Sequence, residues 1–283
     1  MNRTLNTVKY FDLFDYPLTR DELRKWQFKG GEIDTQGLSE LDGFYFLPGR
    51  DVIVKTRKER EMISLKKIRK AQKIARIIGM IPNVSLVSIV SNLGYLNAEL
   101  NADIDLFIVA KPGRIWGVRF WSVMLMKILG QRPTKKNMKD KICLSYYTDE
   151  NNLNLESTKI SEPDPHLCYL VSQNLPIYSE SDMWERFVEE NKWINKYLPN
   201  FKYSEDDKRF MIKLGNPYLK GLIAKTELGF EEKLYRFVQM SKMASELKVA
   251  MNKGDKKVII NDEMLKLHTN DKRDEINRKF EGK

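Results

Sequence analysis

The sequence has few residues that could build a disulfide framework or a zinc module. Its 283 residues include two cysteines, Cys143 and Cys168, and no Cys-x-x-Cys pair. A chain of this length with so few thiols is typical of a reducing compartment. The two histidines, His166 and His268, are too few for a histidine metal site, and we interpret both as ordinary histidines. Disulfide-rich secreted folds and zinc fingers are therefore not expected.

Long apolar runs are also missing. The most apolar stretch, residues 115–129, is shorter than a bilayer span and is interrupted by Arg119 and Lys127. A buried core helix is expected there rather than a membrane segment. Residues 1–10 are polar and do not have the pattern of a secretory signal peptide. We expect a cytoplasmic protein with no membrane partner.

What the sequence has in excess is positive charge. Lys and Arg outnumber Asp and Glu by 49 − 39 = 10. Such a balance suits an anionic partner, for example a nucleoside triphosphate, a nucleic acid or a membrane surface. A lysine-rich solvated surface explains it equally well. The hydrophobic content of 42% is that of a globular chain, and the length allows two or three small domains.

The first part of the chain predicts three helices. Residues 4–14 carry apolar side chains at helical spacing, and Pro17 disfavours helix in the residue before it. Thr19 and Glu22 have the spacing of a capping box, which predicts a second short helix. Residues 35–41 are expected to form the third.

A hairpin is expected to follow these helices. Residues 44–47 and 52–55 alternate as strands do, and Gly49 between them can supply the positive φ of a turn. Three helices and a hairpin predict a winged-helix-like domain over residues 1–58. Such domains often bind DNA through the third helix and the wing. Here that helix is short and acidic, which favours a structural or substrate-orienting role.

A long basic helix is predicted next, over residues 55–76, from Lys55 to Arg76. It carries ten Lys and Arg against Glu59 and Glu61. Its apolar residues keep a helical stripe: Leu65, Ile68, Ala71, Ala75 and Ile78. A basic face is usually only solvated. The functional alternative is a footprint for the phosphate backbone of a nucleic acid.

The centre of the chain, residues 84–110, predicts two strands, 85–90 and 103–109, joined through a polar turn at Ser91-Asn92. Side chains alternate along a strand, so Asp103 and Asp105 point the same way while Ile104 points into the core. Two carboxylates on one face repel each other unless a cation lies between them, and Mg²⁺ is the usual one. The alternative is a solvated strand entrance.

The rest of the chain predicts a crossover helix over residues 114–129 and a third strand over residues 142–147. After a turn at 161–165, every expected element is a helix. The expected ranges are 165–175, 181–197, 222–253 and 262–268. The charged tail, residues 271–283, is expected to fray. We therefore predict an α/β (α+β) domain over residues 59–160 and a helical domain over residues 161–283.

The spacing of the central strands resembles the signature of the DNA polymerase β-like nucleotidyltransferase superfamily, with Ser91-Asn92 standing where that superfamily has Gly-Ser. The whole chain is similar to a bacterial family of nucleotidyltransferase-domain proteins with a winged-helix-like start. That similarity rests on residues 10–19 (YFDLFDYPLT), residues 43–50 (GFYFLPGR), Asn97-Ala98 and residues 111–114 (KPGR).

The resemblance implies a small mixed sheet with flanking helices and a metal-dependent reaction. Asp103 and Asp105 would hold Mg²⁺ or Mn²⁺ and carry the catalysis, while Ser91, Asn92 and Gly94 would bind the phosphates of a nucleoside triphosphate. The reaction would transfer a nucleoside monophosphate to an unidentified acceptor. Lys111 or Arg114 is a further candidate to contact phosphate or acceptor.

Two departures from the family pattern leave an alternative open. The turn is Ser-Asn rather than Gly-Ser, and the third strand offers Ser145 where an acidic residue is expected. Asp149, Glu150 or Glu156 could replace it only in a different strand register. The alternative is a degenerate, weakly catalytic protein that binds nucleotide or nucleic acid as a regulator.

Overall fold

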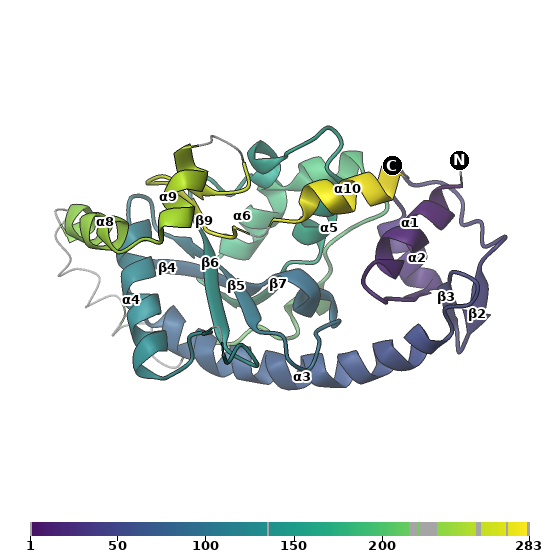
Figure 1. Cartoon of the computed structure of the whole chain (residues 1–283), viewed down its shortest axis with the longest axis horizontal. Coiled ribbons are helices and arrows are strands. Elements are labelled where there is room, and N and C mark those ends of the chain that lie inside the picture. The colour runs from purple at the N-terminus through teal and green to yellow at the C-terminus, as the bar shows by residue number, and fades with distance from the viewer. Residues whose placement is uncertain are drawn as a thin grey trace.

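A six-stranded mixed sheet forms the centre of the computed structural model, which describes residues 2–134, 136–214, 220, 231–252, 256–269 and 271–281 (Figure 1). Its strand order is β7-β4-β5-β6-β9-β8. The strands are β4 (Val84–Ile89), β5 (Ile104–Ala110), β6 (Ile142–Asp149), β7 (Leu175–Ser179), β8 (Ile259–Ile260) and β9 (Met264–Lys266). β5 and β6 are parallel, and the other neighbouring pairs are antiparallel. The predicted mixed α/β class is confirmed.

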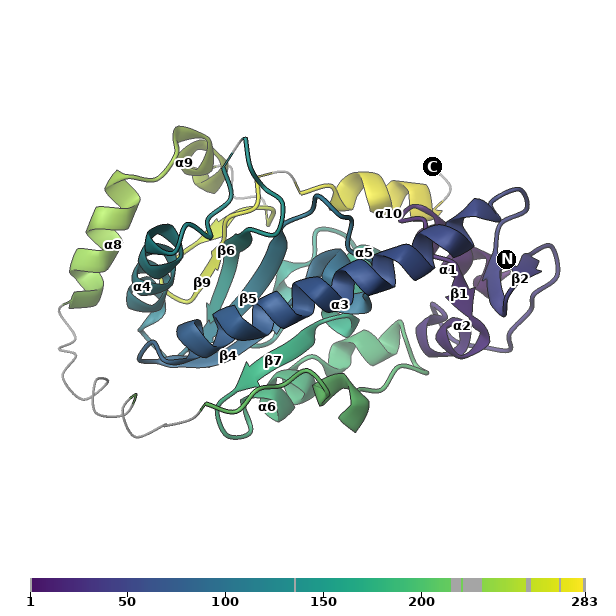
Figure 2. The same cartoon turned by 90° about the horizontal axis from the view of Figure 1, so that it is seen from below.

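The alternation of β5 separates the two faces of the sheet. Ile104, Leu106 and Ile108 pack with α3 (Val52–Gly79) and α4 (Ile115–Ile128) in one core. Phe107 and Val109 pack with α5 (Pro165–Ser172) and α6 (Met183–Glu190) in the other. Figure 2 shows α3 crossing in front of β4 and β5. An odd-numbered residue of β5 therefore faces α5, and an even-numbered one faces α3.

The N-terminal unit contains α1 (Arg3–Asp12), β1 (Leu18–Thr19) and α2 (Arg20–Trp26), followed by β2 (Ser39–Leu41) and β3 (Phe44–Phe46). The capping box at the start of α2 is confirmed, since the Thr19 side chain accepts from the Glu22 backbone and Glu22 accepts from the Thr19 backbone. The predicted third helix over residues 35–41 is wrong. Residues 39–41 instead pair with β3.

The predicted hairpin is also misplaced. Its turn is Asp42-Gly43, where both residues have positive φ (55° and 78°), the backbone of a type I′ turn. The predicted second arm, residues 52–55, is the first turn of α3. An Asp-Gly pair suits this turn because aspartate and glycine tolerate the left-handed conformation better than most residues do.

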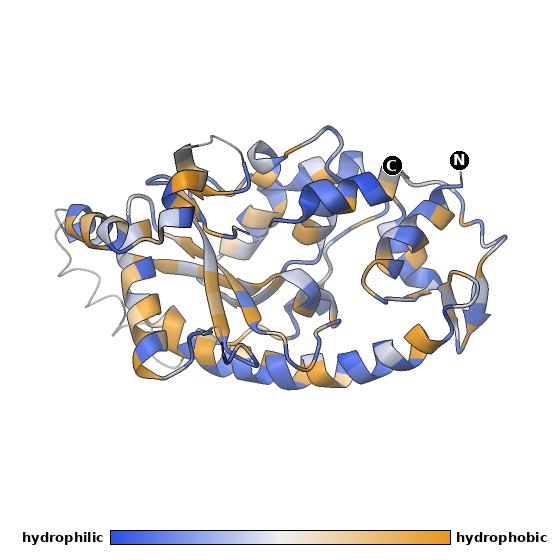
Figure 3. Cartoon of the chain, viewed as in Figure 1, coloured by the Kyte–Doolittle hydropathy of each residue, from blue (hydrophilic) through white to orange (hydrophobic). Residues whose placement is uncertain are grey.

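The predicted long helix is confirmed as α3, whose 28 residues span roughly 40 Å. It connects the N-terminal unit to the sheet and alternates hydrophilic and hydrophobic residues along its length (Figures 1 and 3). Three of its cations are committed inside the molecule: Arg57 pairs with Glu22, Arg60 with Asp15, and Lys67 with Asp140. Its exposed cations include Lys66, Arg69, Lys73 and Arg76.

Beyond residue 160 the chain is not only helical, because β7, β8 and β9 extend the central sheet. The predicted helix over residues 262–268 is wrong, since β9 pairs with β6 there. The predicted helix over 181–197 is α6 followed by a 3₁₀ turn, Lys192–Lys196. The helix predicted over residues 222–253 lies partly outside the described residues. The described part of that range contains two helices, α8 (Glu231–Ser241) and α9 (Ser245–Asn252).

The predicted fraying of the tail is wrong for residues 271–281, which include α10 (Arg273–Glu281). Arg273 and Asn277 both bond the buried carboxylate of Asp164, which fixes α10 beside α5 and α1. The division of the chain at residues 58 and 160 stays a prediction. Within the described part of the chain, no helix combines the length and apolarity needed to cross a bilayer.

Lys67 provides a test of how α3 positions the start of β5. Its buried ammonium donates to the carbonyl oxygens of Leu100 (3.3 Å) and Ala102 (2.7 Å) and pairs with Asp140 at 2.5 Å. Lys67→Met should lower the free energy of unfolding by about 1–3 kcal/mol, because it removes two hydrogen bonds and an ion pair made by a buried ammonium. Urea denaturation measures this. The exposed neighbour Lys66→Met is the control, and equal losses in the two variants would contradict the role of Lys67.

Candidate active site

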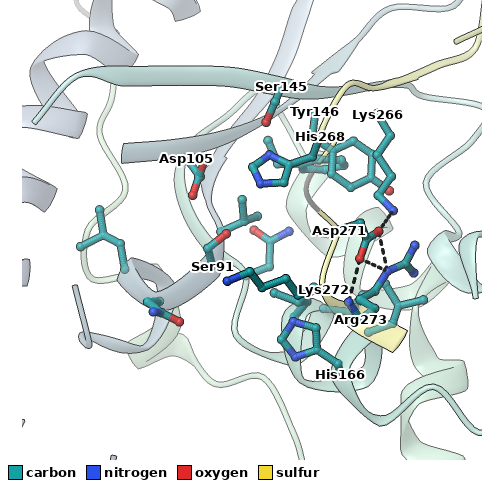
Figure 4. Close-up of a pocket in the computed structure, with 18 of the residues that line it drawn as sticks. Ser91, Asp105, Ser145, Tyr146, His166, Lys266, His268, Asp271, Lys272 and Arg273 are labelled. Carbon is teal, nitrogen blue, oxygen red and sulfur yellow. Dashed lines mark hydrogen bonds and ion pairs between the residues drawn. The ribbon is translucent and has the colours of Figure 1, made fainter. Parts of the chain in front are cut away.

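A cleft of about 500 Å³ opens beside the first residues of β5 (Figure 4). It lies on the face of the sheet that α5 covers. One wall is the 3₁₀ turn η1 (Ser91–Tyr95), and another is the connection between β9 and α10. Its polar lining residues include Ser91, Asn92, Asp103, Asp105, Ser145, His166, His268 and Lys272. Its apolar lining includes Phe14, Leu93, Phe107, Tyr146, Leu167 and Leu170.

Asp103 and Asp105 converge in this cleft. One carboxylate oxygen of each, together with the Cys143 sulfur, lies within 4.8 Å of the others. Neither carboxylate has a Lys, Arg or His partner within ion-pair distance among the residues described. Burial, and then the charge of Asp105, raises the pKa of Asp103. The strand alternation thus brings two like charges together, and no described Lys, Arg or His side chain pairs with either of them.

The backbone before Asp103 is held in place from two sides. Lys67 binds the carbonyl oxygen of Ala102 from α3, and the Asp140 backbone N–H donates to the same oxygen at 3.1 Å. Ile104 then begins the pairing of β5 by donating to the Lys141 carbonyl oxygen at 2.8 Å. The mutual repulsion of the carboxylates is therefore opposed by packing and hydrogen bonds elsewhere rather than relieved by turning one side chain away.

The turn at Ser91 keeps the backbone conformation that glycine favours. Ser91 has a φ of +62°, in the left-handed region. The turn is tied to the acidic strand, because the Val90 backbone N–H donates to the Asp105 carbonyl oxygen at 3.2 Å. The Tyr95 hydroxyl donates to Asn92 Oδ1 at 2.9 Å, which leaves the Asn92 amide as the donor end of that side chain. Ser91 thus adopts a backbone conformation that glycine adopts more readily.

Gly94 does not line the cleft that Ser91 and Asn92 line. A Cβ on Gly94 would lie 2.1 Å from the carbonyl oxygen of Gln173, so glycine is required there by close packing. Lys111 is also away from the cleft. It follows the far end of β5 and pairs with Glu150 (2.9 Å) and Glu180 (3.3 Å). Arg114 is the residue before α4, also beyond the far end of β5.

The third strand brings Cys143, not a carboxylate, opposite Asp105. A bulge then lets both Ser145 and Tyr146 line the cleft. Burial raises the pKa of the Cys143 thiol, which donates weakly to Ser145 Oγ at 3.5 Å, so the thiol is neutral at ordinary pH.

The three acidic residues that a different register could have supplied do not line the cleft. Asp149 accepts from Asn152 at 3.0 Å, and Glu150 accepts from Ser85 at 2.5 Å at the opposite end of the sheet. Glu156 pairs with Lys159 at 2.7 Å. Among the described lining residues, the only other acidic ones are Glu99, which contacts Arg60, and Asp271, which is committed to ion pairs.

The connection between β9 and α10 is the part of the site that sequence reasoning missed. It supplies Lys266, His268, Asp271, Lys272 and Arg273 to the cleft. One local signal was present: residues 258–260 and 264–267 are two apolar runs separated by Asn261-Asp262-Glu263, which is typical of a hairpin. That signal predicts β8 and β9, but it does not predict their position beside β6.

His166 also lines the cleft and is not an ordinary surface histidine. Its Nδ1 is 2.7 Å from the Tyr10 hydroxyl, and its ring stacks on Phe14 with centroids 5.9 Å apart. Burial lowers the pKa of His166 to about 4. The ring is therefore neutral near pH 7 and adds an aromatic surface, not a cation, to the cleft.

The donor set suits a divalent cation with oxygen ligands. Mg²⁺ is usually held by one or two carboxylates and completes its shell with waters and substrate phosphates. Asp103 and Asp105 supply two converging carboxylates without a protein counter-ion, and the cleft leaves space in front of them. The neutral thiol of Cys143 is not a ligand that Mg²⁺ prefers.

No protein-family model matches the sequence, and neither a curated protein nor a solved structure matches it. The function proposed below is therefore inferred from the residues of the cleft.

The left-handed conformation of Ser91 gives a test of the turn. Ser91→Gly should fold at least as stably as the natural chain, because glycine adopts this φ without steric cost. Ser91→Val should lower the free energy of unfolding by about 1–2 kcal/mol, because a side chain, above all a β-branched one, is strained there. Chemical denaturation compares the two. Equal stabilities would show that the turn does not hold this conformation.

The raised pKa of Asp103 predicts a pH-dependent stability. The unfolded chain releases this proton at a lower pH than the folded chain, so folding loses stability as pH rises through the two values. The full penalty is present near neutral pH. Asp103→Asn in metal-free buffer should therefore raise the melting temperature at about pH 7, with the gain vanishing near pH 3, where both states are protonated.

The control for this comparison is Glu190→Gln, which removes one exposed negative charge from the end of α6. It should shift the melting temperature much less than Asp103→Asn at neutral pH. Mg²⁺ should stabilise the natural chain more than the Asp103→Asn variant. A neutral-pH melting temperature unchanged by Asp103→Asn would contradict the predicted repulsion.

Proposed function

We propose that this protein is a metal-dependent nucleotidyltransferase that transfers a nucleoside monophosphate from a nucleoside triphosphate to an acceptor hydroxyl. The observation that carries the proposal is the convergence of Asp103 and Asp105, without a protein counter-ion among the described residues, beside the Ser91 turn in an open cleft. The central sheet is then a nucleotidyltransferase fold of the DNA polymerase β-like kind, as the sequence pattern indicates.

Each side chain has a physical task in this proposal. Asp103 and Asp105 would hold Mg²⁺, or Mn²⁺ in its place, against the α-phosphate. The Ser91 hydroxyl and the Asn92 amide would donate hydrogen bonds to phosphate oxygens, in place of the Gly-Ser turn. The bound metal would neutralise charge on the transferring phosphate and bring the acceptor oxygen close to it. The neutral aromatic and apolar wall, which includes Phe14 and His166, would exclude water.

The N-terminal unit fits a supporting role in this proposal. Its order is helix, strand, helix and hairpin, and the described residues between α2 and β2 form no helix. A winged-helix-like domain without its third helix lacks the helix that such domains often place in a DNA groove. Its Phe14 lines the cleft, which favours a part in orienting the substrate.

Release of pyrophosphate tests the proposal. The protein is incubated with each labelled nucleoside triphosphate and Mg²⁺ or Mn²⁺, with and without cell extract as a source of acceptor. Metal-dependent pyrophosphate release and a labelled product are expected. Asp103→Asn and Asp105→Asn should each lower the rate by at least about 100-fold, because each removes charge from the metal site. Glu190→Gln should leave it unchanged. Equal rates in the aspartate variants would overturn the assignment.

The alternative is a weakly catalytic protein that binds nucleotide as a regulator. It is favoured by one observation: Cys143 and Ser145 stand on the third strand where a third carboxylate would help activate the acceptor. Metal-dependent nucleotide binding that Asp103→Asn removes, without pyrophosphate release under any condition above, would support it.

A nucleic-acid partner is a second candidate, because one side of α3 is basic and exposed. The exposed cations of that side include Lys66, Arg69, Lys73 and Arg76. Salt-sensitive binding of duplex or tRNA that the aspartate variants do not alter would favour this partner.

A further inference from the structure

The connection between β9 and α10 is anchored by a buried ion-pair network. We call its described residues, 266–269 and 271–273, the C-terminal strap. The Arg273 side chain is 3% exposed; its Nη1 donates to the Thr158 carbonyl oxygen at 2.9 Å and lies 3.3 Å from Asp164 Oδ2. Asp271 bridges Arg273 (2.9 Å) and Lys266 (2.8 Å). The end of the strap next to α10 is therefore fixed in position.

This anchoring determines where Lys272 points. Asp271 and Arg273 both turn their side chains into the buried network, so the side chain between them projects to the other side. Figure 4 shows Lys272 extending into the cleft toward Ser91, while Asp271 and Arg273 contact each other on the far side of the backbone. Lys272 is exposed and has no carboxylate within ion-pair distance in the described part of the chain.

The other basic side chains of the cleft are less suited to bind an anion. Lys266 and Arg273 already share Asp271. His166 is neutral, because burial lowers its pKa to about 4. His268 lies on the Asp105 side of Ser91, opposite the side from which Lys272 approaches (Figure 4). Lys272 is thus the uncommitted ammonium among the described residues that face Ser91.

The acidic pair and Lys272 lie at different sides of the Ser91 turn. Asp105, whose carboxylate converges with that of Asp103, lies on one side of Ser91, and Lys272 approaches Ser91 from the strap on the other (Figure 4). A phosphate chain that begins at the carboxylate-held metal and follows the Ser91 turn would end near the Lys272 ammonium. The charges of the cleft therefore have the order that a metal-bound polyphosphate requires.

We infer that Lys272 binds the terminal phosphates of the triphosphate and stabilises the pyrophosphate as it leaves. This inference rests on the proposed function. In the transfer, the acceptor oxygen forms a bond to the α-phosphorus, and the bond from that phosphorus to the oxygen bridging it to the β-phosphate breaks. Negative charge then grows on the pyrophosphate, and the ammonium of Lys272 offsets it. The acceptor's proton passes to solvent or to an aspartate.

Binding of an inorganic anion tests Lys272 independently of any nucleotide chemistry. The full-length protein is titrated with inorganic tripolyphosphate and Mg²⁺ in a calorimeter, at low and at moderate salt. Lys272→Gln should weaken binding about tenfold and reduce its dependence on salt. Lys272→Arg keeps the charge and should retain most of the affinity. Lys242→Gln, which removes an exposed lysine at the end of α8, is the matched control.

Kinetics give a second measurement. If pyrophosphate release is observed, Lys272→Gln should raise KM for the triphosphate and lower kcat, since the charge acts on both the bound substrate and the leaving group. Lys272→Arg should restore most of both values. The melting temperature of each variant is measured to show that it folds, because a solvent-exposed lysine should contribute little to stability.

The outcomes separate the two proposals. If Lys272→Gln binds tripolyphosphate as tightly as Lys242→Gln does, or if the natural chain does not bind it, the role of Lys272 is wrong, and an observed transferase activity would still stand. If tripolyphosphate binding depends on Lys272 but no triphosphate yields pyrophosphate, the anion site stands and the transferase proposal falls.

Discussion

The repulsion between Asp103 and Asp105 is the constraint on which the arrangement of this molecule depends. Two half-buried carboxylates with oxygens within 4.8 Å are unfavourable together, and burial, followed by the charge of Asp105, raises the pKa of Asp103. A free strand end would relieve it by moving one side chain into solvent. Here Lys67 holds the preceding backbone from α3, and β6 pairs along the strand, so the charges stay together. Packing energy elsewhere in the fold therefore maintains two like charges at short distance.

The elements around the acidic pair come from all parts of the chain. The Phe14 carbonyl oxygen accepts from Arg60 of α3 at 2.8 Å and from Asn97 at 2.9 Å, which joins the N-terminal unit to the loop before β5. Asn97 also donates its backbone N–H to the Asn92 carbonyl oxygen at 2.8 Å, which links the same junction to the Ser91 turn. The strap closes the opposite side through Arg273 and Asp164. The cleft therefore depends on two long-range junctions that each use an arginine, Arg60 at one side and Arg273 at the other, and on a local backbone bond that holds the Ser91 turn.

The polar turn and the third strand show how this chain departs from a simple pattern. Serine at position 91 keeps a left-handed backbone at a steric cost, and it adds a hydroxyl to the cleft. Cys143, opposite Asp105, offers a neutral thiol where a third carboxylate would add a further repulsion. The site thus has less negative charge than a three-carboxylate site, while Lys272 adds positive charge on the far side of the turn.

Local periodicity made part of this structure predictable. The twofold repeat of a strand put Asp103 and Asp105 on one face, the stripe from Ile68 to Ile78 defined α3, and Thr19 with Glu22 began α2. Asp42-Gly43 was an equally local signal for the hairpin. Assigning residues 35–41 to a third helix placed the first arm of this hairpin in the wrong kind of element. The tertiary structure alone decided that Cys143 lies opposite Asp105, that β7 and β9 join the sheet, and that Lys272 faces Ser91. Those relations depend on strand register and on pairings between residues more than a hundred positions apart, such as Arg273 with Asp164, and no repeat within a short segment encodes them.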